Sequence, residues 1–290
     1  MRIAVLSDIH GNLPALEAVL ENLKTRTPDG LIVAGDFVGG PNPDQTIDLL
    51  RSLKPNWMIL GNSDINILRY IDGQVPETYR TAKQFALLRW GSNHISSESI
   101  NFLRDLPQQQ VITLDGTAPI RVVHGSLGNP FDGYDPEKEP GKFDYDFQNL
   151  DEMVLVCGHT HCPWSVERNG KLALNPGSVA GPLNGYVGTQ YALLDWMDGH
   201  WKSQLYSLPY DISRICSDFS ESGLFEAGGV LARCFLDSIE SGENVSGWFL
   251  QYAFMLAEQA GFSNFPVIPN EIWENAEVKF NWKRLNKTNN

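Results

Sequence analysis

The chain has 290 residues, of which 42% are hydrophobic and 20% charged, a composition typical of a folded protein with a substantial core. Acidic residues outnumber basic ones by 35 to 22, and the net charge of −13 argues against broad binding to nucleic acid or anionic membranes. The longest mostly apolar stretch, 248–262, is interrupted by polar residues and is shorter than the roughly 20 apolar residues that span a bilayer. The four cysteines are sparse and a strand pattern begins at residue 2, so we expect a soluble, cytoplasmic protein.

The first sixty residues alternate short apolar runs with amphipathic segments. Strands are predicted at 2–7, 31–34 and 57–60, and helices at 13–24 and 43–53. This β-α-β-α-β order is typical of a partly parallel sheet with helices packed on it. The stretch 65–106 lacks the alternation of strands, and we expect helices and loops there.

Short strands dominate from residue 111 onward. They are predicted at 111–114, 120–123, 154–156, 164–167, 172–174, 191–195 and 201–206. The turn signals Asn169-Gly170 and Asp198-Gly199 favour hairpins. The second half is therefore expected to be largely antiparallel.

The character of the chain changes after Pro209 to amphipathic helical segments, predicted at 212–220, 224–239 and 246–260. We place a boundary here, with residues 1–208 as the main domain and 209–290 as a C-terminal helical extension. The extension could form the surface of a homodimer, cap the site or pack on the main domain, and we favour packing. The last residues, 286–290, are expected to fray.

Polar side chains follow the ends of several predicted strands. They are Asp8, His10, Asp36, Asn62, His124, His159 and His161. Ligands bind at the carboxyl ends of strands in α/β sheets, so these side chains are candidates for a shared site. The i, i+2 pairs Asp8/His10 and His159/His161 would each point to one side if the backbone stayed extended. Carboxylate, imidazole and amide ligands together suit Mn, Fe, Ni or Zn better than Ca.

Each of these residues has a simpler interpretation when taken alone. Asp8 and Asp36 could be helix N-caps, and Asn62 could be a turn residue. His124 or His159 alone would more often be a hydrogen-bonded core histidine than a ligand. The occurrence of all the motifs together favours the site.

The remaining histidines and the cysteines near the last motif are expected to be structural. His94 and His200 lie outside the motifs and are predicted at the surface. Cys157 and Cys162 flank the G-H-T-H motif, but no second cysteine pair completes a closed zinc site, so we expect buried thiols.

The ordered motifs D-x-H, G-D-x-V-G, G-N-x-D, V-H-G and G-H-T-H, followed by NPGSV at 175–179, resemble the calcineurin-like metallophosphoesterase superfamily, with its compact bacterial phosphodiesterase branch closest. The resemblance covers roughly residues 1–208. It implies an α/β fold, a four-layer αββα sandwich of two mixed sheets. It also implies that one metal ion is held by Asp8, His10, Asp36 and His161, and a second by Asp36, Asn62, His124 and His159. Asp8, His10, Asp36, Asn62 and His124 would be the catalytic residues.

The function that this resemblance implies is a dinuclear-metal-dependent phosphoesterase. It would hydrolyse small phosphodiesters or phosphoanhydrides, such as dinucleoside polyphosphates, with a metal-bound hydroxide. Two divalent ions contribute +4 and Asp8 and Asp36 contribute −2, which leaves +2 for binding an anion in an acidic chain. The alternatives are a protein serine/threonine phosphatase and a metal-binding scaffold without activity. The filled ligand positions disfavour the scaffold.

The segment 132–152 is strongly acidic. It has eight acidic residues against Lys138 and Lys142, which argues against a nucleic acid substrate. We interpret it as either a solvated loop or a segment that selects the substrate, with equal weight.

One residue departs from the pattern of many family members, which carry a histidine after the metal-binding asparagine. This chain has Ser63, followed by Asp64. A serine cannot act as a general acid near neutral pH, so the leaving group is expected to depart unassisted, unless Tyr134 or Asp132 supplies the proton. This departure also disfavours the protein phosphatase. Asp64 is expected to orient neighbouring groups, as the acidic residue at this position is thought to do in relatives.

Overall fold

The first of two sheets contains five strands in the order β10-β9-β1-β2-β3. The structure is a computed structural model that describes residues 1–262 and 267–282. The strands are β1 (Arg2–Leu6), β2 (Gly30–Val33), β3 (Trp57–Met58), β9 (Thr189–Met197) and β10 (His200–Leu208). β1, β2 and β3 are parallel, while β9 runs antiparallel to both β1 and β10. The predicted β-α-β-α-β unit is therefore confirmed.

The second sheet has the order β4-β5-β6-β8-β7. Its strands are β4 (Gln109–Ile112), β5 (Ile120–Val123), β6 (Val154–Val156), β7 (Trp164–Arg168) and β8 (Lys171–Asn175). The hairpin predicted at Asn169-Gly170 joins β7 to β8, but β5, β6 and β8 are parallel neighbours. The expectation of a largely antiparallel second half is wrong for this sheet. The long connection from β5 to β6 lets the chain cross back, and turn residues carry no signal for such a crossover.

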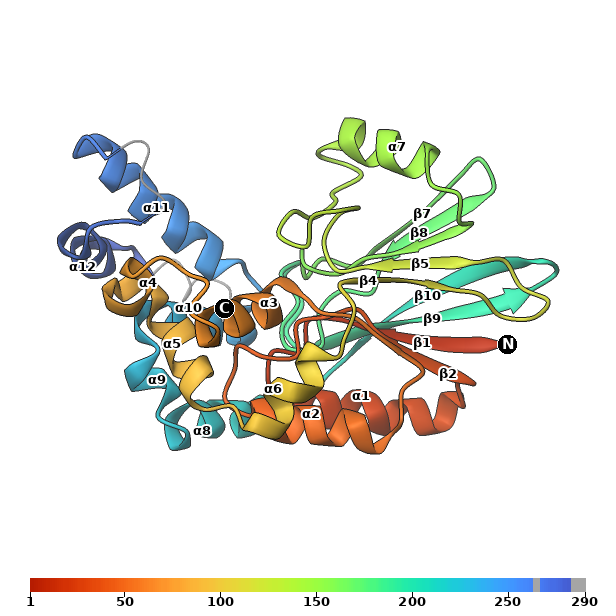
Figure 1. Cartoon of the computed structure of the whole chain (residues 1–290), viewed down its shortest axis with the longest axis horizontal. Helices are drawn as coiled ribbons and strands as arrows, with labels where there is room; N and C mark the ends of the chain where they lie inside the picture. The colour runs from red at the N-terminus through yellow and green to blue at the C-terminus, as the bar shows by residue number, and fades with distance from the viewer. Residues whose placement is uncertain (263–266, 283–290) are drawn as a thin grey trace.

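The two sheets pack face to face over a shared apolar core (Figure 1). Inward-facing residues such as Val5 and Ile32 of the first sheet meet Val122 and Val156 of the second. On the outer face of the first sheet lie α1 (Leu13–Arg26) and α2 (Pro43–Ser52), and on that of the second lies α7 (Pro140–Gln148). These four layers confirm the predicted αββα sandwich.

The interpretation of the acidic segment 132–152 as a solvated loop is wrong for the residues that form helix α7. Phe143 and Phe147 are buried against the second sheet, so part of this segment is a packed helix. Several of the acidic residues also have cationic partners. These pairs are Asp132–Lys142, Asp135–Lys138, Asp144–Arg168 and Glu152–Arg121. Much of the negative charge is therefore balanced locally.

Two groups of helices lie together at one end of the sandwich (Figure 1). The first follows β3 and contains α3 (Asn62–Ile71), α4 (Thr78–Thr81), a short 3-10 helix (Lys83–Phe85), α5 (Ala86–Asn93) and α6 (Ser97–Arg104). The second is C-terminal and contains α8 (Ile212–Glu221), α9 (Leu224–Ala227), α10 (Gly229–Ser241), α11 (Val245–Gln259) and α12 (Asn270–Lys279). Trp90 of α5 packs against Phe219 of α8 in a shared apolar cluster.

The C-terminal helices differ from the prediction in two places. The helix predicted at 224–239 is broken at Gly228-Gly229, where Gly229 has a φ of +67° that favours glycine. Helix α12 has no counterpart in the prediction. Residues 286–290, predicted to fray, lie outside the described residues. Over 1–262 and 267–282, the structure contains no helix both long and apolar enough to cross a membrane.

Candidate metal centre

Loops at the carboxyl ends of five strands bring the seven predicted side chains into one cluster. Asp8 and His10 follow β1, Asp36 follows β2, Asn62 begins α3 after β3, His124 follows β5, and His159 and His161 follow β6. These strands run parallel within each sheet, so their carboxyl ends meet at one edge of the sandwich.

The candidate ligand atoms lie within a few ångströms of one another. Asp8 Oδ1 is 3.3 Å from His161 Nε2 and 3.9 Å from His124 Nε2. Asp36 Oδ2 is 3.4 Å from His10 Nε2 and 3.5 Å from His124 Nε2, so it faces histidines on both sides. Two groups have atoms close enough to share an ion, Asp8/His10/His161 and Asp8/Asp36/His124.

Asn62 completes the cluster on the side of the second sheet. Its side-chain oxygen lies 2.9 Å from His124 Nε2 and 2.7 Å from His159 Nδ1. The amide oxygen therefore shares the centre with two imidazole nitrogens.

Three of the histidines are oriented by backbone carbonyls. The Nδ1 atoms of His10, His124 and His161 lie near the carbonyl oxygens of Val38, Ala34 and Gly181, at 2.9, 2.7 and 3.0 Å. A proton donated from Nδ1 to a carbonyl leaves the Nε2 lone pair directed at the cluster. The Nε2 atoms of His10 and His161 are then 3.1 Å apart, and their lone pairs face each other. A cation bound between the two nitrogens would stabilise this arrangement.

A buried carboxylate oxygen provides a direct test of whether a metal ion fits. Asp8 is fully buried, and its Oδ1 has no hydrogen-bond partner among the described residues. A buried polar atom without a partner is costly, and a carboxylate more so. Burial opposes ionisation, but His161 and His124 hold the pKa of Asp8 at about 2. An ionised oxygen ringed by imidazole nitrogens is a suitable ligand for a divalent transition metal.

The electrostatics of the other central groups follow from the same proximity. Burial opposes the charged form of Asp36, but His124 and His10 hold the pKa of its carboxyl well below the usual range. Burial likewise disfavours the His124 cation, but Asp36 and Asp8 raise the pKa of His124 to about 10. The cluster thus favours positive charge between its two carboxylates.

The backbone of the cluster is not extended, contrary to the interpretation of the i, i+2 pairs. Asp8, His10, Asp36, His159 and His161 have φ values of 55°, 44°, 57°, 69° and 57°. The loops after β1 and β2 turn sharply and are bonded to each other, for example from Ile9 N–H to the Asp36 carbonyl at 2.8 Å. Left-handed backbone at non-glycine residues is costly and concentrates at functional sites.

Asp64 orients the loop that carries Asp36, as expected from the sequence. Its fully buried carboxylate accepts hydrogen bonds from four backbone N–H groups. The donors are Asp36, Gly61, Phe37 and Val38, at 2.9, 2.8, 2.9 and 3.2 Å. Burial and the nearby Asp36 charge raise the pKa of Asp64 to about 7.

Ser63 has a structural role that the sequence analysis missed. Its hydroxyl donates to Asp36 Oδ2 at 2.9 Å, and its backbone N–H donates to Oδ1 at 2.8 Å. Both oxygens of Asp36 are therefore fixed by one residue. The spacing G-N-S-D gave no signal for this pair of bonds, because it depends on how the loops after β2 and β3 meet.

Two glycines allow the loops to approach this closely. A Cβ at Gly61 would lie 2.1 Å from Asp36 Oδ1, and one at Gly158 would lie 1.9 Å from Ser7 Oγ. Any side chain at either position would displace the loops around the two carboxylates.

The simpler interpretations of the two aspartates are wrong. The N-cap of α1 is Asn12, whose side chain accepts from Ala15 N–H, and the N-cap of α2 is Asn42. Asp8 and Asp36 lie before these caps and face the cluster.

The residues predicted to be structural behave largely as expected. His94 and His200 are exposed, which confirms their surface position. Cys157 is buried, but Cys162 is only half-buried. The two residues named as alternative proton donors are each engaged elsewhere. Tyr134 is buried, which raises its pKa, and donates to Asp146 at 2.6 Å, while Asp132 pairs with Lys142.

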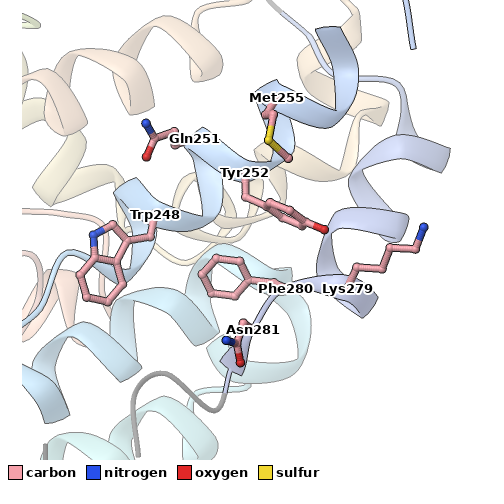
Figure 2. Close-up of a pocket in the computed structure, with 7 residues that line it drawn as sticks. All are labelled: Trp248, Gln251, Tyr252, Met255, Lys279, Phe280 and Asn281. Atoms are coloured by element: carbon pink, nitrogen blue, oxygen red, sulfur yellow. The ribbon is translucent and has the colours of Figure 1, made fainter. Parts of the chain in front are cut away.

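Two cavities differ in their relation to the cluster. One of about 100 Å³ touches His124 and is lined by polar residues that include Gln108, Ser126 and Asn129. The other, of about 430 Å³, lies between α11 and α12 (Figure 2). Its lining residues are Trp248, Gln251, Tyr252, Met255, Lys279, Phe280 and Asn281. The larger cavity contains none of the seven clustered side chains.

Comparison with known proteins identifies the family. Residues 1–199 match the model of the calcineurin-like phosphoesterase superfamily domain. The uncharacterized protein MJ0912 of Methanocaldococcus jannaschii is 30% identical over 235 residues, which cover 73% of this chain and 89% of that protein. The phosphodiesterase YfcE of Escherichia coli K12 is 28% identical over 198 residues, which cover 67% of this chain and 88% of YfcE.

A solved structure agrees with these matches. The crystal structure of a metallophosphoesterase from Sphaerobacter thermophilus aligns with a TM-score of 0.63 at 26% identity, over 77% of this chain and 95% of that one. The family match spans all seven clustered side chains and confirms the predicted resemblance. The chain belongs to the calcineurin-like phosphoesterase superfamily and is a metal-dependent hydrolase of phosphoric esters.

Proposed function

We propose that the cluster holds two divalent metal ions, each Mn, Fe, Ni or Zn. Asp8, His10, Asp36 and His161 would hold the first ion, and Asp36, Asn62, His124 and His159 the second. The observation that carries this proposal is the buried Asp8 Oδ1, which has no hydrogen-bond partner among the described residues and faces the Nε2 atoms of three histidines. Asp36 Oδ2, between His10 and His124, suits a ligand shared by both ions.

The residues around the ions prepare the reaction. Two such ions, when bound, lower the pKa of a water molecule and neutralise phosphoryl oxygens during in-line displacement. Ser63 and Asp64 fix the orientation of Asp36 and its loop, and the carbonyls of Val38, Ala34 and Gly181 orient the histidines. The ligand geometry is therefore set before a substrate arrives.

We infer that the substrates are small phosphodiesters or phosphoanhydrides of the dinucleoside polyphosphate type. Similarity to the YfcE phosphodiesterase supports the diester class. The preference for good leaving groups rests on the residues near Asn62. Ser63 Oγ is bonded to Asp36, and Tyr134 and Asp132 have other partners. A protein serine/threonine phosphatase would have to protonate an alkoxide of much higher pKa, which disfavours that alternative.

The same reasoning extends to the organisation and location of the chain. We propose the division into residues 1–208 and a helical extension at 209–290, because the family match ends at residue 199 and the last sheet strand at Leu208. All four cysteines are free thiols, which supports the reducing cytoplasm as the location.

The test combines metal analysis with a substrate screen. Protein loaded with Mn²⁺ and exchanged into metal-free buffer is analysed for metal content, then assayed with an aryl phosphodiester, an aryl phosphomonoester, a dinucleoside polyphosphate and a phosphoserine peptide. We expect two ions per chain and faster hydrolysis of the diester and the polyphosphate. A chain that stays metal-free contradicts the proposed centre, and preferential hydrolysis of the phosphopeptide favours the protein phosphatase.

A further inference from the structure

One face of α10 contacts the strand-end loops. Phe235 and Ile239 are four residues apart on this helix, so their side chains lie one above the other on the same face. The ring of Phe235 meets the ring of His10 edge-on, with centroids 5.6 Å apart and an interplanar angle of 74°. Ile239 packs so closely on Gly181 that a Cβ added there would lie 3.1 Å from Ile239 Cγ1.

Both contacts lead to histidines on one side of the cluster. His10 touches Phe235 directly. His161 is reached through Gly181, whose carbonyl accepts from His161 Nδ1 at 3.0 Å. The two imidazole rings are themselves neighbours, with centroids 5.0 Å apart. A single helical turn of α10 therefore supports the pair that, with Asp8 and Asp36, forms the first proposed metal site.

Helix α10 is itself fixed at two points. Phe235 packs edge-on against the fully buried Phe219 of α8, with ring centroids 5.6 Å apart. At the end of α10, the Gly242 carbonyl accepts from Gly185 N–H at 2.9 Å. His124, on the other side of the cluster, is held instead by the Ala34 carbonyl at the end of β2. Both sides thus have a carbonyl support from the chain after β2, and on the first side the contacts of α10 are added to it.

We propose that Phe235 and Ile239 are positioning residues for the first metal site, so that α10 sets the affinity of one of the two ions. This inference rests on the proposed dinuclear centre. The ring of Phe235 limits rotation of the His10 ring. Ile239 fixes the carbonyl that determines which nitrogen of His161 carries the proton. Groups that orient metal ligands in this way change metal affinity when they are altered, although they touch no metal.

The test compares two variants, in each of which one phenylalanine is replaced by leucine. Phe235→Leu keeps an apolar side chain but removes the aromatic ring that packs against His10. Phe249→Leu is the matched control, because Phe249 is fully buried in α11 and packs with Trp273, Phe280 and Trp282. Mn²⁺ affinity is measured by calorimetry, and the occupancy of each site by anomalous scattering from crystals at limiting Mn²⁺.

We expect Phe235→Leu to weaken the first site by about 10- to 100-fold and to leave the second unchanged, the range found for groups that orient metal ligands. Phe249→Leu should leave both affinities unchanged. Ile239→Ala, which removes the Cγ1 atom that packs on Gly181, should weaken the first site in the same direction, and it provides the test if Phe235→Leu does not fold.

Three outcomes contradict this inference while leaving the dinuclear centre intact. They are wild-type affinity in the α10 variants, equal weakening of both sites, and equal weakening by Phe249→Leu. A wild-type chain that binds no metal ion contradicts the proposed centre itself, and the inference with it.

Discussion

The loops at the strand ends and the helices α11 and α12 each border a cavity, but their chemistry differs. In the loops, five polar residues have positive φ, and Asp8 Oδ1 lies buried with no hydrogen-bond partner among the described residues. Between α11 and α12, the larger cavity is lined mainly by Trp248, Tyr252, Met255 and Phe280 (Figure 2). In this molecule, the coincidence of left-handed backbone with an unsatisfied buried carboxylate marks the chemistry, whereas cavity volume does not.

This comparison predicts that function and stability can be separated by mutation. Variants in the strand-end loops should lose metal binding and activity and keep the fold. Variants in the cores of α11 and α12 should lose stability, while the chains that stay folded keep their metal ions. Each experiment below tests one side of this separation.

The largest effect is expected at Asp36, the carboxylate placed between both groups of histidines. Asp36→Asn should reduce the content of both metal ions and lower kcat/KM by more than about 100-fold. About 100-fold is the largest loss typical of residues that only orient metal ligands, and Asp36 is proposed to be a ligand itself. Asp48→Asn, on the exposed face of α2, is the control for loss of a negative charge. Elemental analysis and an aryl diester assay measure both effects. Full metal content in Asp36→Asn would contradict its shared role.

The next effect is on stability and concerns Phe249, which is fully buried beside Trp273. Phe249→Ala should lower the free energy of unfolding by about 3–5 kcal/mol, because it removes a large side chain and leaves a cavity. Metal content per folded chain should not change. Denaturant unfolding followed by tryptophan fluorescence measures the first quantity and elemental analysis the second. Loss of metal ions at constant stability would show that the two regions are not separable.

A smaller and more selective effect is expected from two histidines of one motif. His161→Ala should reduce occupancy of the first metal site, and His159→Ala that of the second, each by at least about tenfold in affinity. The two variants make the same exchange two residues apart, so each is the control for the other. Anomalous scattering at limiting Mn²⁺ reports the two occupancies. The assignment of ligands to sites fails if both variants empty the same site.

The positions of the strands and of the clustered residues were predicted better from the sequence than the pairing of the strands within the sheets. Asp8, Asp36 and His124 each come within two residues of an apolar run, so their place at strand ends is visible in the local pattern. The parallel pairing of β5, β6 and β8 is not, because it depends on a long crossover rather than on turn residues. The break at Gly228-Gly229 was missed for a related reason, since the apolar spacing continues through both glycines.

The contacts that support the candidate site were also beyond the sequence pattern. In the sequence, Ser63 was notable only because it replaces the histidine of many family members. In the structure, it donates hydrogen bonds to both carboxylate oxygens of Asp36. Phe235 lies more than 200 residues from His10 in the chain, and only the packing of α10 brings their rings together. Motifs report residues that act directly, whereas residues that orient them depend on tertiary packing.

The smallest effect expected is a change in leaving-group dependence, and it depends on Ser63. A phosphate leaving group has a pKa of roughly 6. An alkoxide, with a conjugate acid near the pKa of water at about 15.7, needs a proton or a metal. With Ser63 Oγ bonded to Asp36, kcat/KM for aryl diesters should fall steeply as the leaving-group pKa rises. Ser63→His should flatten this dependence by supplying an acid, whereas Ser63→Ala, which only loses the bond to Asp36, should lower all rates and keep the slope. A flat dependence in the wild type, with alkyl phosphomonoesters cleaved as readily as anhydrides, would show that another residue donates the proton.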